Sequence, residues 1–321
     1  MDTMPTPTFP ERPAKPALTP ADAFAAIGRG KPTATELAAL SDLSRAGARE
    51  FASVWPRFPE ESRHSVLRRL AELAETNVEH LFGRVYRVAL SDVSPVARQL
   101  AISALWEDEG SDLIELFATL LESDPSPDVR AESAAALGRF AELATYESLN
   151  SHEVGRVKQT LYAAAFTDDQ PDHVRRRALE SISIFGDLVE TQSLISEFFD
   201  SDDTATKASA IFAMGRSLDR RWLPTVIAEL GSDDSEIRYE AARAAGELGH
   251  VDAVEAVSGL VRDPDPEIRH AAIISLGKMG GPGAVRILRA LVDASPEADA
   301  EIIEDALAEA SLGGDMIRAQ S

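Results

Sequence analysis

The sequence of 321 residues contains no cysteine. The protein therefore cannot form a disulfide bond, and it offers no thiol nucleophile, zinc knuckle or cysteine-bound iron–sulfur cluster. This absence is typical of a reducing compartment, so we expect a cytoplasmic location. No run of 18 apolar residues occurs, and no stretch near the amino terminus has the apolar core of a signal peptide, so we expect no membrane contact.

Basic residues are also scarce, with 32 Lys and Arg against 54 Asp and Glu, which gives a formal net charge of −22. Because proteins gain affinity for phosphate backbones through Lys and Arg, this balance argues against nucleic acid as a partner. Aromatic residues make up only 6%, and runs in which β-branched residues alternate with polar ones are absent. Alanine and arginine, both strong helix formers, are abundant. The composition therefore predicts an all-α protein.

Proline is concentrated at the amino terminus, where the first 20 residues hold six of the 18 prolines. We expect a disordered, polyproline-like arm there, with a ligand for an aromatic groove as the alternative. Thr19 and Pro20 predict the start of the first helix, and Thr33 with Glu36 predicts a capping box at the next one. The expected domains are an arm over residues 1–18, a helical-repeat solenoid with an amino-terminal helical cap over 19–312, and a flexible tail over 313–321.

One pattern recurs along the chain: an Asp, a turn that often contains Pro, an aliphatic residue and then Arg. A small or apolar residue follows three positions after the Arg, an aliphatic residue seven after, and a small residue eight after. The clearest copy runs from Asp263 through Arg269 to Leu276 and Gly277. The Arg position of the pattern recurs at residues 63, 98, 130, 175, 207, 238, 269 and 300. Lys occupies it at 207, and Ala occupies it at 300 in the degenerate last copy.

The spacing of these positions is 31 or 32 residues in most intervals, with one gap of 45. Each unit has room for two amphipathic helices, and a second apolar stretch such as 112–121 lies between successive Arg-bearing stretches. A fixed period of this length predicts stacked helical hairpins, a solenoid. We expect the 45-residue gap to hold an insertion of about 13 residues around 143–152, relative to the usual repeat length.

The segments DPSPDVRAESAAALG and DPDPEIRHAAIISLG resemble HEAT repeats, of the short type also found in phycobilisome-lyase-like proteins. The resemblance covers about residues 35–312 and implies a right-handed, armadillo-like α-solenoid of about eight hairpins. It implies a scaffold or adaptor most of all, since the family consists mainly of such proteins. Members that act on chromophores or on alkylated DNA supply the alternatives.

The repeated Asp and Arg residues have a structural explanation. An Asp six residues before the Arg, such as Asp124 or Asp263, is placed to cap the second helix of its repeat and to meet the Arg of a neighbouring repeat. The small residue eight positions after the Arg would allow successive helices to approach closely. We therefore interpret the Asp–Arg pattern as structural and not as catalytic.

No familiar catalytic motif is present. The glycine-rich segment 277–283 lacks a preceding strand and a Ser or Thr after its lysine, so it is no phosphate loop. The six histidines lack metal-ligand spacing, and the acidic segment 200–203 lacks the glycine and glutamate of an EF-hand, so we read it as a helix-capping turn. We therefore expect no enzyme activity, no metal and no cofactor.

A partner would bind the exposed ridge of the second helices, which line the concave face of a solenoid. On a helical wheel of 100° per residue, positions three and seven residues after the Arg face the core, and positions two, five and nine face away from it. The outward rows mix Arg and Glu with two apolar residues, Phe212 and Ile274. Arg beside exposed aromatic residues is typical of protein–protein interfaces.

These rows and two aromatic turns supply the candidate partner-binding residues. For Trp106 and Trp222 the alternative is packing at irregular repeat junctions, and for Phe212 it is an ordinary core position. The candidates are Trp106, Glu107, Arg139, Phe140, Phe212, Arg216, Asp219, Arg220, Trp222 and Arg243.

The sequence thus favours a non-catalytic scaffold or adaptor that binds another protein of unknown identity along its concave face. One alternative is a HEAT-like nucleic-acid enzyme of the DNA-glycosylase kind, which would need a coherent basic stripe. The other is a chaperone of the chromophore-lyase kind, which only the repeat type supports. The sequence does not indicate an oligomeric state.

Overall fold

The computed structural model of the protein describes residues 18–292 and 299–319, with the side chains described as far as Ser311. These residues form helices and turns only, so the all-α prediction is confirmed. The predicted arm lies outside the described residues, apart from Leu18. The chain divides into two units, residues 1–108 and 109–321.

Unit 1 contains six α-helices, and its first two begin as the sequence predicts. Thr19 and Thr33 cap them, and each Thr forms a capping box with the acidic residue three positions later. The helices are α1 (Pro20–Gly28), α2 (Ala34–Ala38), α3 (Arg45–Val54), α4 (Glu60–Thr76), α5 (Gly83–Ala89) and α6 (Pro95–Ala104), with a 3₁₀ turn η1 (Trp55–Arg57) after α3.

Unit 2 continues the alternation of first and second helices. Its first helices are α7 (Asp112–Ser123), α9 (Ser151–Phe166), α11 (Val189–Phe199), α13 (Leu223–Glu229), α15 (Val254–Ser258) and α17 (Gly281–Val292). Its second helices are α8 (Pro127–Thr145), α10 (Asp172–Ile182), α12 (Thr204–Arg216), α14 (Ser235–Leu248), α16 (Pro266–Met279) and α18 (Ala300–Ala319). The 3₁₀ turns η2 (Arg220–Trp222), η3 (Val251–Ala253) and η4 (Gly259–Arg262) flank α13 and α15.

All eight repeat positions lie in the first turn of a second helix. In α4, α6, α8, α10, α12, α14 and α16 the position is the fourth helical residue, and in α18 it is the first. Each of these helices follows a first helix, from α3 to α17, so the described chain contains eight hairpins. The α-solenoid predicted from the repeat is confirmed.

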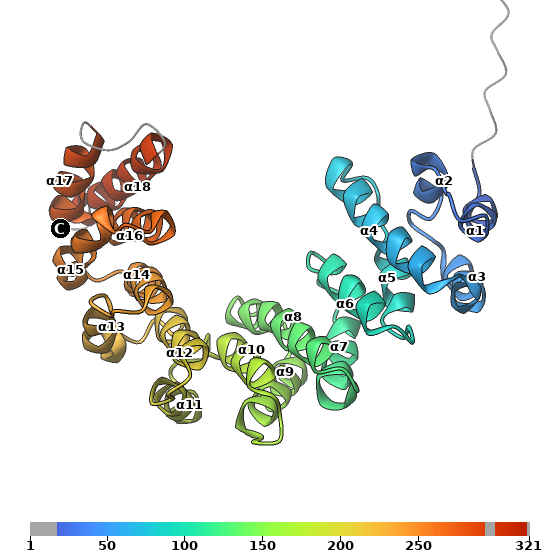
Figure 1. Ribbon diagram of the computed structural model, residues 1–321, viewed down its shortest axis with the longest axis horizontal. Helices are drawn as coiled ribbons and strands as arrows, with labels where there is room; N and C mark the ends of the chain where they lie inside the picture. Colours follow the sequence, from blue (N-terminus) through green and yellow to red (C-terminus); the bar gives the residue numbers. More distant parts are fainter. Residues whose placement is uncertain (1–17, 293–298, 320–321) are drawn as a thin grey trace, which may run out of the picture. The chain divides into compact units, whose positions relative to one another are not determined.

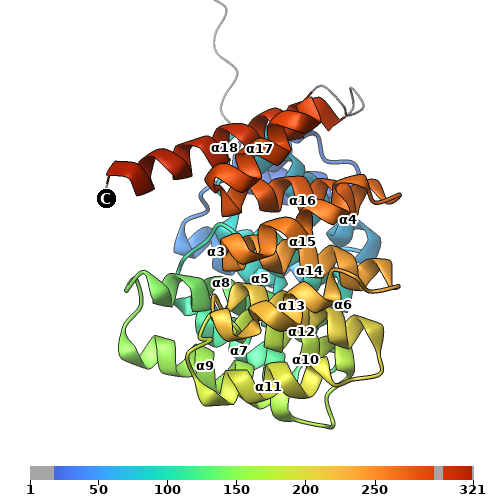
Figure 2. The same cartoon turned by 90° about the vertical axis from the view of Figure 1, so that its left-hand side faces the viewer.

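Within unit 2 the second helices follow one another along one side, and α10, α12, α14 and α16 lie in chain order in both views (Figures 1 and 2). The surface formed by α8, α10, α12, α14 and α16 is called the second-helix face below. Positions three and seven residues after the repeat Arg or Lys are buried in all seven repeats that have one. The helices therefore present their apolar stripe to the core, as the helical wheel predicts.

The small residue eight positions after the Arg is where neighbouring second helices touch. A Cβ atom added to Gly215 would lie 2.6 Å from Ala244 Cα, and one added to Gly246 would lie 2.5 Å from Ser275 Oγ. Ser275 Oγ also donates a hydrogen bond to the Ala242 carbonyl oxygen in the preceding second helix, at 2.7 Å. Close approach of the backbones thus explains the small residue.

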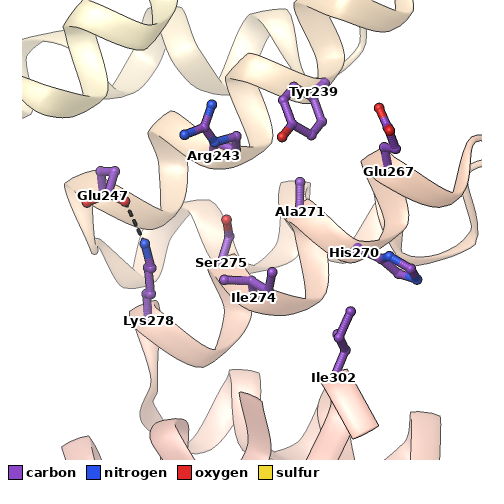
Figure 3. Close-up of a pocket in the computed structure, with 10 residues that line it drawn as sticks. All are labelled: Tyr239, Arg243, Glu247, Glu267, His270, Ala271, Ile274, Ser275, Lys278 and Ile302. Atoms are coloured by element: carbon purple, nitrogen blue, oxygen red, sulfur yellow. Dashed lines mark hydrogen bonds and ion pairs between the residues drawn. The ribbon is translucent and has the colours of Figure 1, made fainter. Parts of the chain in front are cut away.

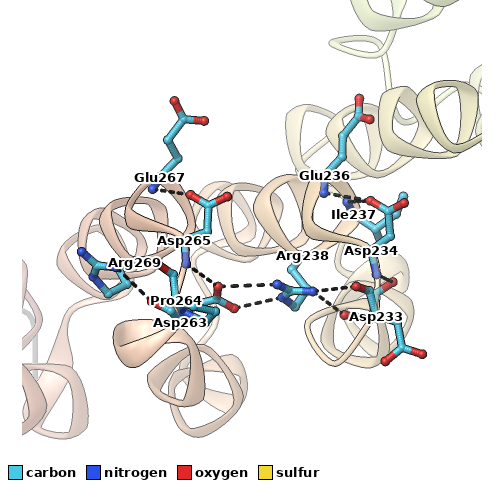
Figure 4. Close-up of polar contacts among 11 residues, drawn as sticks. Asp233, Asp234, Glu236, Ile237, Arg238, Asp263, Pro264, Asp265, Glu267 and Arg269 are labelled. Atoms are coloured by element: carbon cyan, nitrogen blue, oxygen red, sulfur yellow. Dashed lines mark hydrogen bonds and ion pairs between the residues drawn. The ribbon is translucent and has the colours of Figure 1, made fainter.

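The Asp–Arg pattern forms a ladder between repeats (Figure 4). Arg238 Nε donates to Asp263 Oδ2 of the next repeat at 3.0 Å, and Arg238 Nη1 donates to the Ser232 carbonyl oxygen at 2.9 Å. Burial alone would raise the pKa of Asp263, but hydrogen bonds from Arg238 and from the backbone N–H of Asp265 hold that pKa below its usual value. The predicted contact between repeats is confirmed.

The predicted helix-capping role of the ladder Asp is wrong. Asp263 Oδ1 accepts a hydrogen bond from the backbone N–H of Asp265, which forms a turn before α16, and Asp265 itself is the N-cap. Asp203 and Asp234 cap α12 and α14 in the same way. The reason is geometric, because only the residue next to the first turn can reach the free N–H groups of a helix.

Two predicted boundaries differ from the structure. The extra residues around 143–152 lengthen the helices, since α8 has 19 residues and α9 has 16, and only a short turn separates them. Helix α18 continues to Ala319, beyond the predicted end of the helical repeats at 312. Among the described residues, no helix combines the length and the apolar character needed to cross a membrane.

Candidate functional site

The outward rows of the helical wheel remain accessible in the structure. None of the residues five or nine positions after the seven repeat Arg or Lys residues is buried. The row at two positions is mixed, because Ser209 and Ala271 are buried between neighbouring second helices. The prediction therefore holds for two of the three rows, and the third lies at the seam where second helices pack.

Arg243 of α14 contacts two aromatic rings on the second-helix face, that of the predicted residue Phe212 and that of Tyr239. Its Cζ lies 5.6 Å from the ring centre of Phe212 in α12 and 5.5 Å from that of Tyr239. Arg243 Nη1 also donates to both carboxylate oxygens of Glu240, at 3.2 Å each. Phe212 is half-buried and not part of the closed core. An Arg between aromatic rings at an accessible surface is a rigid, amphipathic contact element.

A group of carboxylates lies beside this element. Burial raises the pKa of Glu240 above its usual value although Arg243 opposes the shift, and the charges of Glu180 and Glu236 raise it further. Glu180 Oε1 accepts a hydrogen bond from Ser209 Oγ at 2.7 Å. Acidic side chains of α10 and α14 are thus coupled on this face, and Ser209 of α12, which lies between these two helices in chain order, binds one of them.

A cavity of about 390 Å³ opens on the same face between α14, α16 and α18 (Figure 3). Its floor is apolar, with Ala271, Ile274 and Ile302. Figure 3 shows Tyr239 and Arg243 on the α14 side, Glu267 and His270 towards one end, and Glu247 and Lys278 at the other. Ile274 is 42% exposed although it lies in the middle of a helix. Ser275 completes the lining.

Most charged groups around the cavity are paired within the protein. Lys278 Nζ donates to Glu247 Oε1 at 2.6 Å, and His270 Nε2 lies 2.8 Å from Asp299 Oδ1. Glu267 differs from them. Its backbone N–H donates to Asp265, but its carboxylate has no ion pair among the described residues.

Helical periodicity identified only part of this cavity. It placed Arg243, Ile274, Lys278 and Glu247 on the outward rows but did not include Tyr239, Glu267 or His270. Tyr239 and His270 both follow a repeat Arg directly, and Glu267 precedes one by two positions. A helical wheel extended backwards to the first turn would have placed Glu267 among the outward positions, whereas Tyr239 and His270 lie at the side of that stripe.

The other predicted residues of α8 and α12 differ in their burial and position. Arg216 Nη2 lies 3.5 Å from Glu142 Oε2 of α8, so it lies on the predicted face. Arg139 is half-buried, with its Cζ 5.3 Å from the ring centre of Phe140. Phe140 itself is fully buried, and its ring centre lies 6.3 Å from that of Phe117. Its assignment to a partner site is wrong, because it lies ten residues after the repeat Arg, where the wheel turns back towards the core.

The two aromatic turns are not part of the helices that form the second-helix face. Trp106 is 67% exposed, which excludes the packing alternative, and it lies in unit 1 with the exposed Glu107. Trp222 is half-buried, and its Nε1 has no acceptor among the described residues. It shares the α12–α13 turn with Asp219, which caps η2, and with the exposed Arg220.

The described residues contain no group of three or more His, Asp or Glu side chains arranged to hold a metal ion. The arrangement on the second-helix face is instead one of rings, guanidinium groups and carboxylates around an apolar hollow.

The pattern of HEAT repeats matches residues 86–152, 191–257 and 223–308, which together make up more than half of the chain. Among curated proteins, deoxyhypusine hydroxylase of Bos taurus is 31% identical over 118 residues, or 36% of this chain. The match spans only 37% of the length of that relative.

Two solved structures with a similar fold are complexes of larger proteins. Kap121p bound to Pho4p has a TM-score of 0.51 and 14% identity, with coverage of 86% of this chain and 35% of that one. Kap95p with RanGDP has a TM-score of 0.50 and 15% identity, with coverage of 90% and 44%. At this level of identity the likeness shows the fold alone.

The similarity to a hydroxylase contradicts our expectation that the protein is not an enzyme. That expectation depended on the absence of familiar catalytic motifs, each of which belongs to one particular fold. A motif search does not detect an active site built on helical repeats, because the functional side chains of such a site come from helices that are far apart in sequence.

Proposed function

The chain belongs to the HEAT-repeat family, and we propose that the second-helix face of its unit 2 binds another protein. The observation that carries this proposal is the contact of the Arg243 guanidinium with the rings of Phe212 and Tyr239, at the edge of a cavity with an apolar floor. Tyr and Arg are enriched at the centres of protein interfaces, where each combines a large planar contact area with hydrogen-bonding groups.

The charge of the face supports a protein partner over nucleic acid. Arg177, Arg216, Arg243 and Lys278 are each paired with a glutamate of the same face. Paired cations leave no coherent basic stripe for a phosphate backbone. Kap121p bound to Pho4p offers an analogy, since that protein of similar fold binds a protein. We keep the cytoplasm as the proposed compartment, which cell fractionation tests.

An affinity capture with matched variants tests the proposal. We expect wild-type protein to retain a set of partners that Phe212→Ala loses and Phe166→Ala keeps. Phe166 is a matched control because it is an accessible phenylalanine, 46% exposed, on the first helix α9. Equal retention by all three proteins would show that the second-helix face does not bind the captured partners.

A second candidate function is the enzymatic modification of a bound protein. The observation that favours it is the 31% identity to deoxyhypusine hydroxylase over 118 residues. Mass spectrometry of the captured partner, isolated from cells with and without this protein, tests it. Addition of one oxygen atom to the partner only in the presence of the protein would support hydroxylation, and identical masses would exclude it for that partner.

A further inference from the structure

The cavity between α14, α16 and α18 has a distinct chemical character. Its apolar floor contains Ile274, which is 42% exposed, and the half-buried Ile302. A volume of about 390 Å³ lies at the lower end of the range for ligand sites, about 300–1,000 Å³. It is large enough for one or two side chains but not for a helix. An aliphatic side chain of a partner would remove this floor from water.

The charges that remain unpaired near the cavity are negative. Glu236 and Glu267 occupy equivalent positions, each two residues before the Arg of successive repeats, and neither carboxylate has an ion pair among the described residues. Figure 4 shows both side chains pointing away from the Asp–Arg ladder. Because Arg243 and Lys278 already have glutamate partners, a ligand with a positive charge gains more here than one with a negative charge.

Two independent features therefore lie next to each other: an accessible apolar floor and an unpaired carboxylate at its end. We propose that this cavity binds an extended segment of the partner in which a basic and an aliphatic residue stand two positions apart, so that both side chains point to the same side of the segment. The aliphatic side chain packs on Ile274 and Ile302, and the cation pairs with Glu267. This inference rests on the proposed protein-binding function and adds the chemistry of the bound segment.

The length of the segment follows from the helix spacing. Second helices packed at about 8–10 Å place α14 and α18 roughly 20 Å apart. An extended chain advances about 3.3 Å per residue, so about six residues span this distance, and an octapeptide leaves about one more residue at each end. The overall charge of −22 adds a long-range attraction for a basic segment, which salt weakens.

Defined peptides test the inference on the full chain. The probes are three acetylated octapeptides with Ser at the even positions and with Arg and Leu in turn, Glu and Leu in turn, or Arg and Ser in turn at the odd positions, and their affinities are measured by calorimetry. We expect the Arg/Leu peptide to bind at least about tenfold more tightly than the other two, because only it satisfies both the floor and the carboxylate. Equal affinities, or tighter binding of the Glu/Leu peptide, would overturn the inference.

Four variants locate the binding site. We expect Glu267→Gln to weaken the Arg/Leu peptide about two- to fivefold, as for an accessible ion pair, and Ile274→Ser about tenfold. The matched controls are Glu255→Gln on α15 and Val292→Ser on α17, which change the same chemistry at exposed positions of first helices. If the two control variants weaken binding as much as Glu267→Gln and Ile274→Ser do, the peptide binds by non-specific attraction, and the inference is overturned. Circular dichroism verifies that each variant is folded.

The capture experiment separates this inference from the proposed function. If Phe212→Ala loses the partner while Ile274→Ser and Glu267→Gln keep it fully, the face binds protein but the cavity does not, and the inference fails alone. If no variant of the face affects capture, both fail. Binding of the Glu/Leu peptide to the wild-type protein that is lost in Lys278→Ala would show an anion site in the cavity and overturn the inference.

Discussion

Arg243 lies with its Cζ 5.6 Å from the ring centre of Phe212, which belongs to the preceding second helix. Both residues were predicted to face outward from helical periodicity alone, and both are accessible in the structure. Their contact joins α12 to α14 across the second-helix face. This contact supports the proposed function. Whether Phe212 lies outside the hydrophobic core can be tested directly.

The two phenylalanines Phe212 and Phe140 should respond differently to truncation. Phe140 is fully buried, so Phe140→Ala should lower the free energy of unfolding by about 3–5 kcal/mol. Phe212 is half-buried at the surface, so Phe212→Ala should cost less than about 2 kcal/mol. Urea unfolding followed by circular dichroism measures both, and equal losses would place Phe212 in the core.

The buried ion pair of unit 1 should matter far more than an exposed one. Arg63 and Asp92 are 6% and 2% exposed at their side chains, and Asp92 also accepts a hydrogen bond from Trp55 Nε1. Arg63→Ala leaves a buried carboxylate without its cation, which should cost about 3–5 kcal/mol of unfolding free energy.

The control for that variant is Arg84→Ala. Arg84 and Asp42 form a pair whose side chains are 45% and 75% exposed, so its loss should cost about 0–1 kcal/mol. Urea unfolding of both variants makes the comparison. A similar small loss in the two would show that the buried ladder contributes little to the stability of the repeats.

The glycine at the seam between second helices should be intolerant of a methyl group. In Gly215→Ala the new Cβ would meet Ala244 Cα at 2.6 Å, so overpacking should destabilise the protein by about 1–3 kcal/mol. Gly155 in α9 has no atom within 4 Å of such a Cβ, so Gly155→Ala should stabilise its helix by up to about 1 kcal/mol. Thermal melts should therefore shift in opposite directions, and a stabilising Gly215→Ala would contradict the packing described.

The raised pKa of Glu240 gives a pH dependence with a defined sign. Because burial raises this pKa in the folded protein above the usual 4.5, the folded state holds the proton more tightly than the unfolded state. The associated stability is complete below about pH 4.5 and is lost as the pH rises through the folded pKa.

Glu240→Gln removes this loss, because the amide does not ionise. The difference in unfolding free energy, variant minus wild type, should therefore be more positive at neutral pH than at pH 4. Urea unfolding of both proteins at the two pH values measures this difference. Titration of the Glu240 carboxyl by NMR checks the cause. A folded pKa at or below 4.5, or a difference between the proteins that does not change with pH, would contradict the burial of this group.

The sequence predicted the repeats well because their physics is local and periodic. Arg238 and its equivalents recur at a spacing that two helices and two turns impose, and the seam glycines follow at a constant distance. Phe140 was misplaced because a position ten residues after the Arg has turned back to the core. The extra residues in the 45-residue interval extend α8 and α9, since no residue there stops a helix before Tyr146.

The cavity could be predicted only in part. Ile274, Glu247 and Lys278 lie on the outward rows, but Ile302 comes from a repeat whose Arg is replaced by Ala, where the pattern is weakest. The hollow itself depends on how α14, α16 and α18 pack together, which periodicity does not specify. The possibility of enzyme activity was also beyond a motif search, because it emerged only from similarity to a whole repeat segment.

Site-specific photo-crosslinking tests the central claim most directly. A photoreactive amino acid is placed at the position of Ile274 on the second-helix face or at that of Glu255 on the first helix α15, and cells expressing each full-length protein are irradiated. The account predicts that the partner lost by Phe212→Ala is cross-linked from position 274 and not from position 255. Cross-linking from 255 with none from 274 would contradict it.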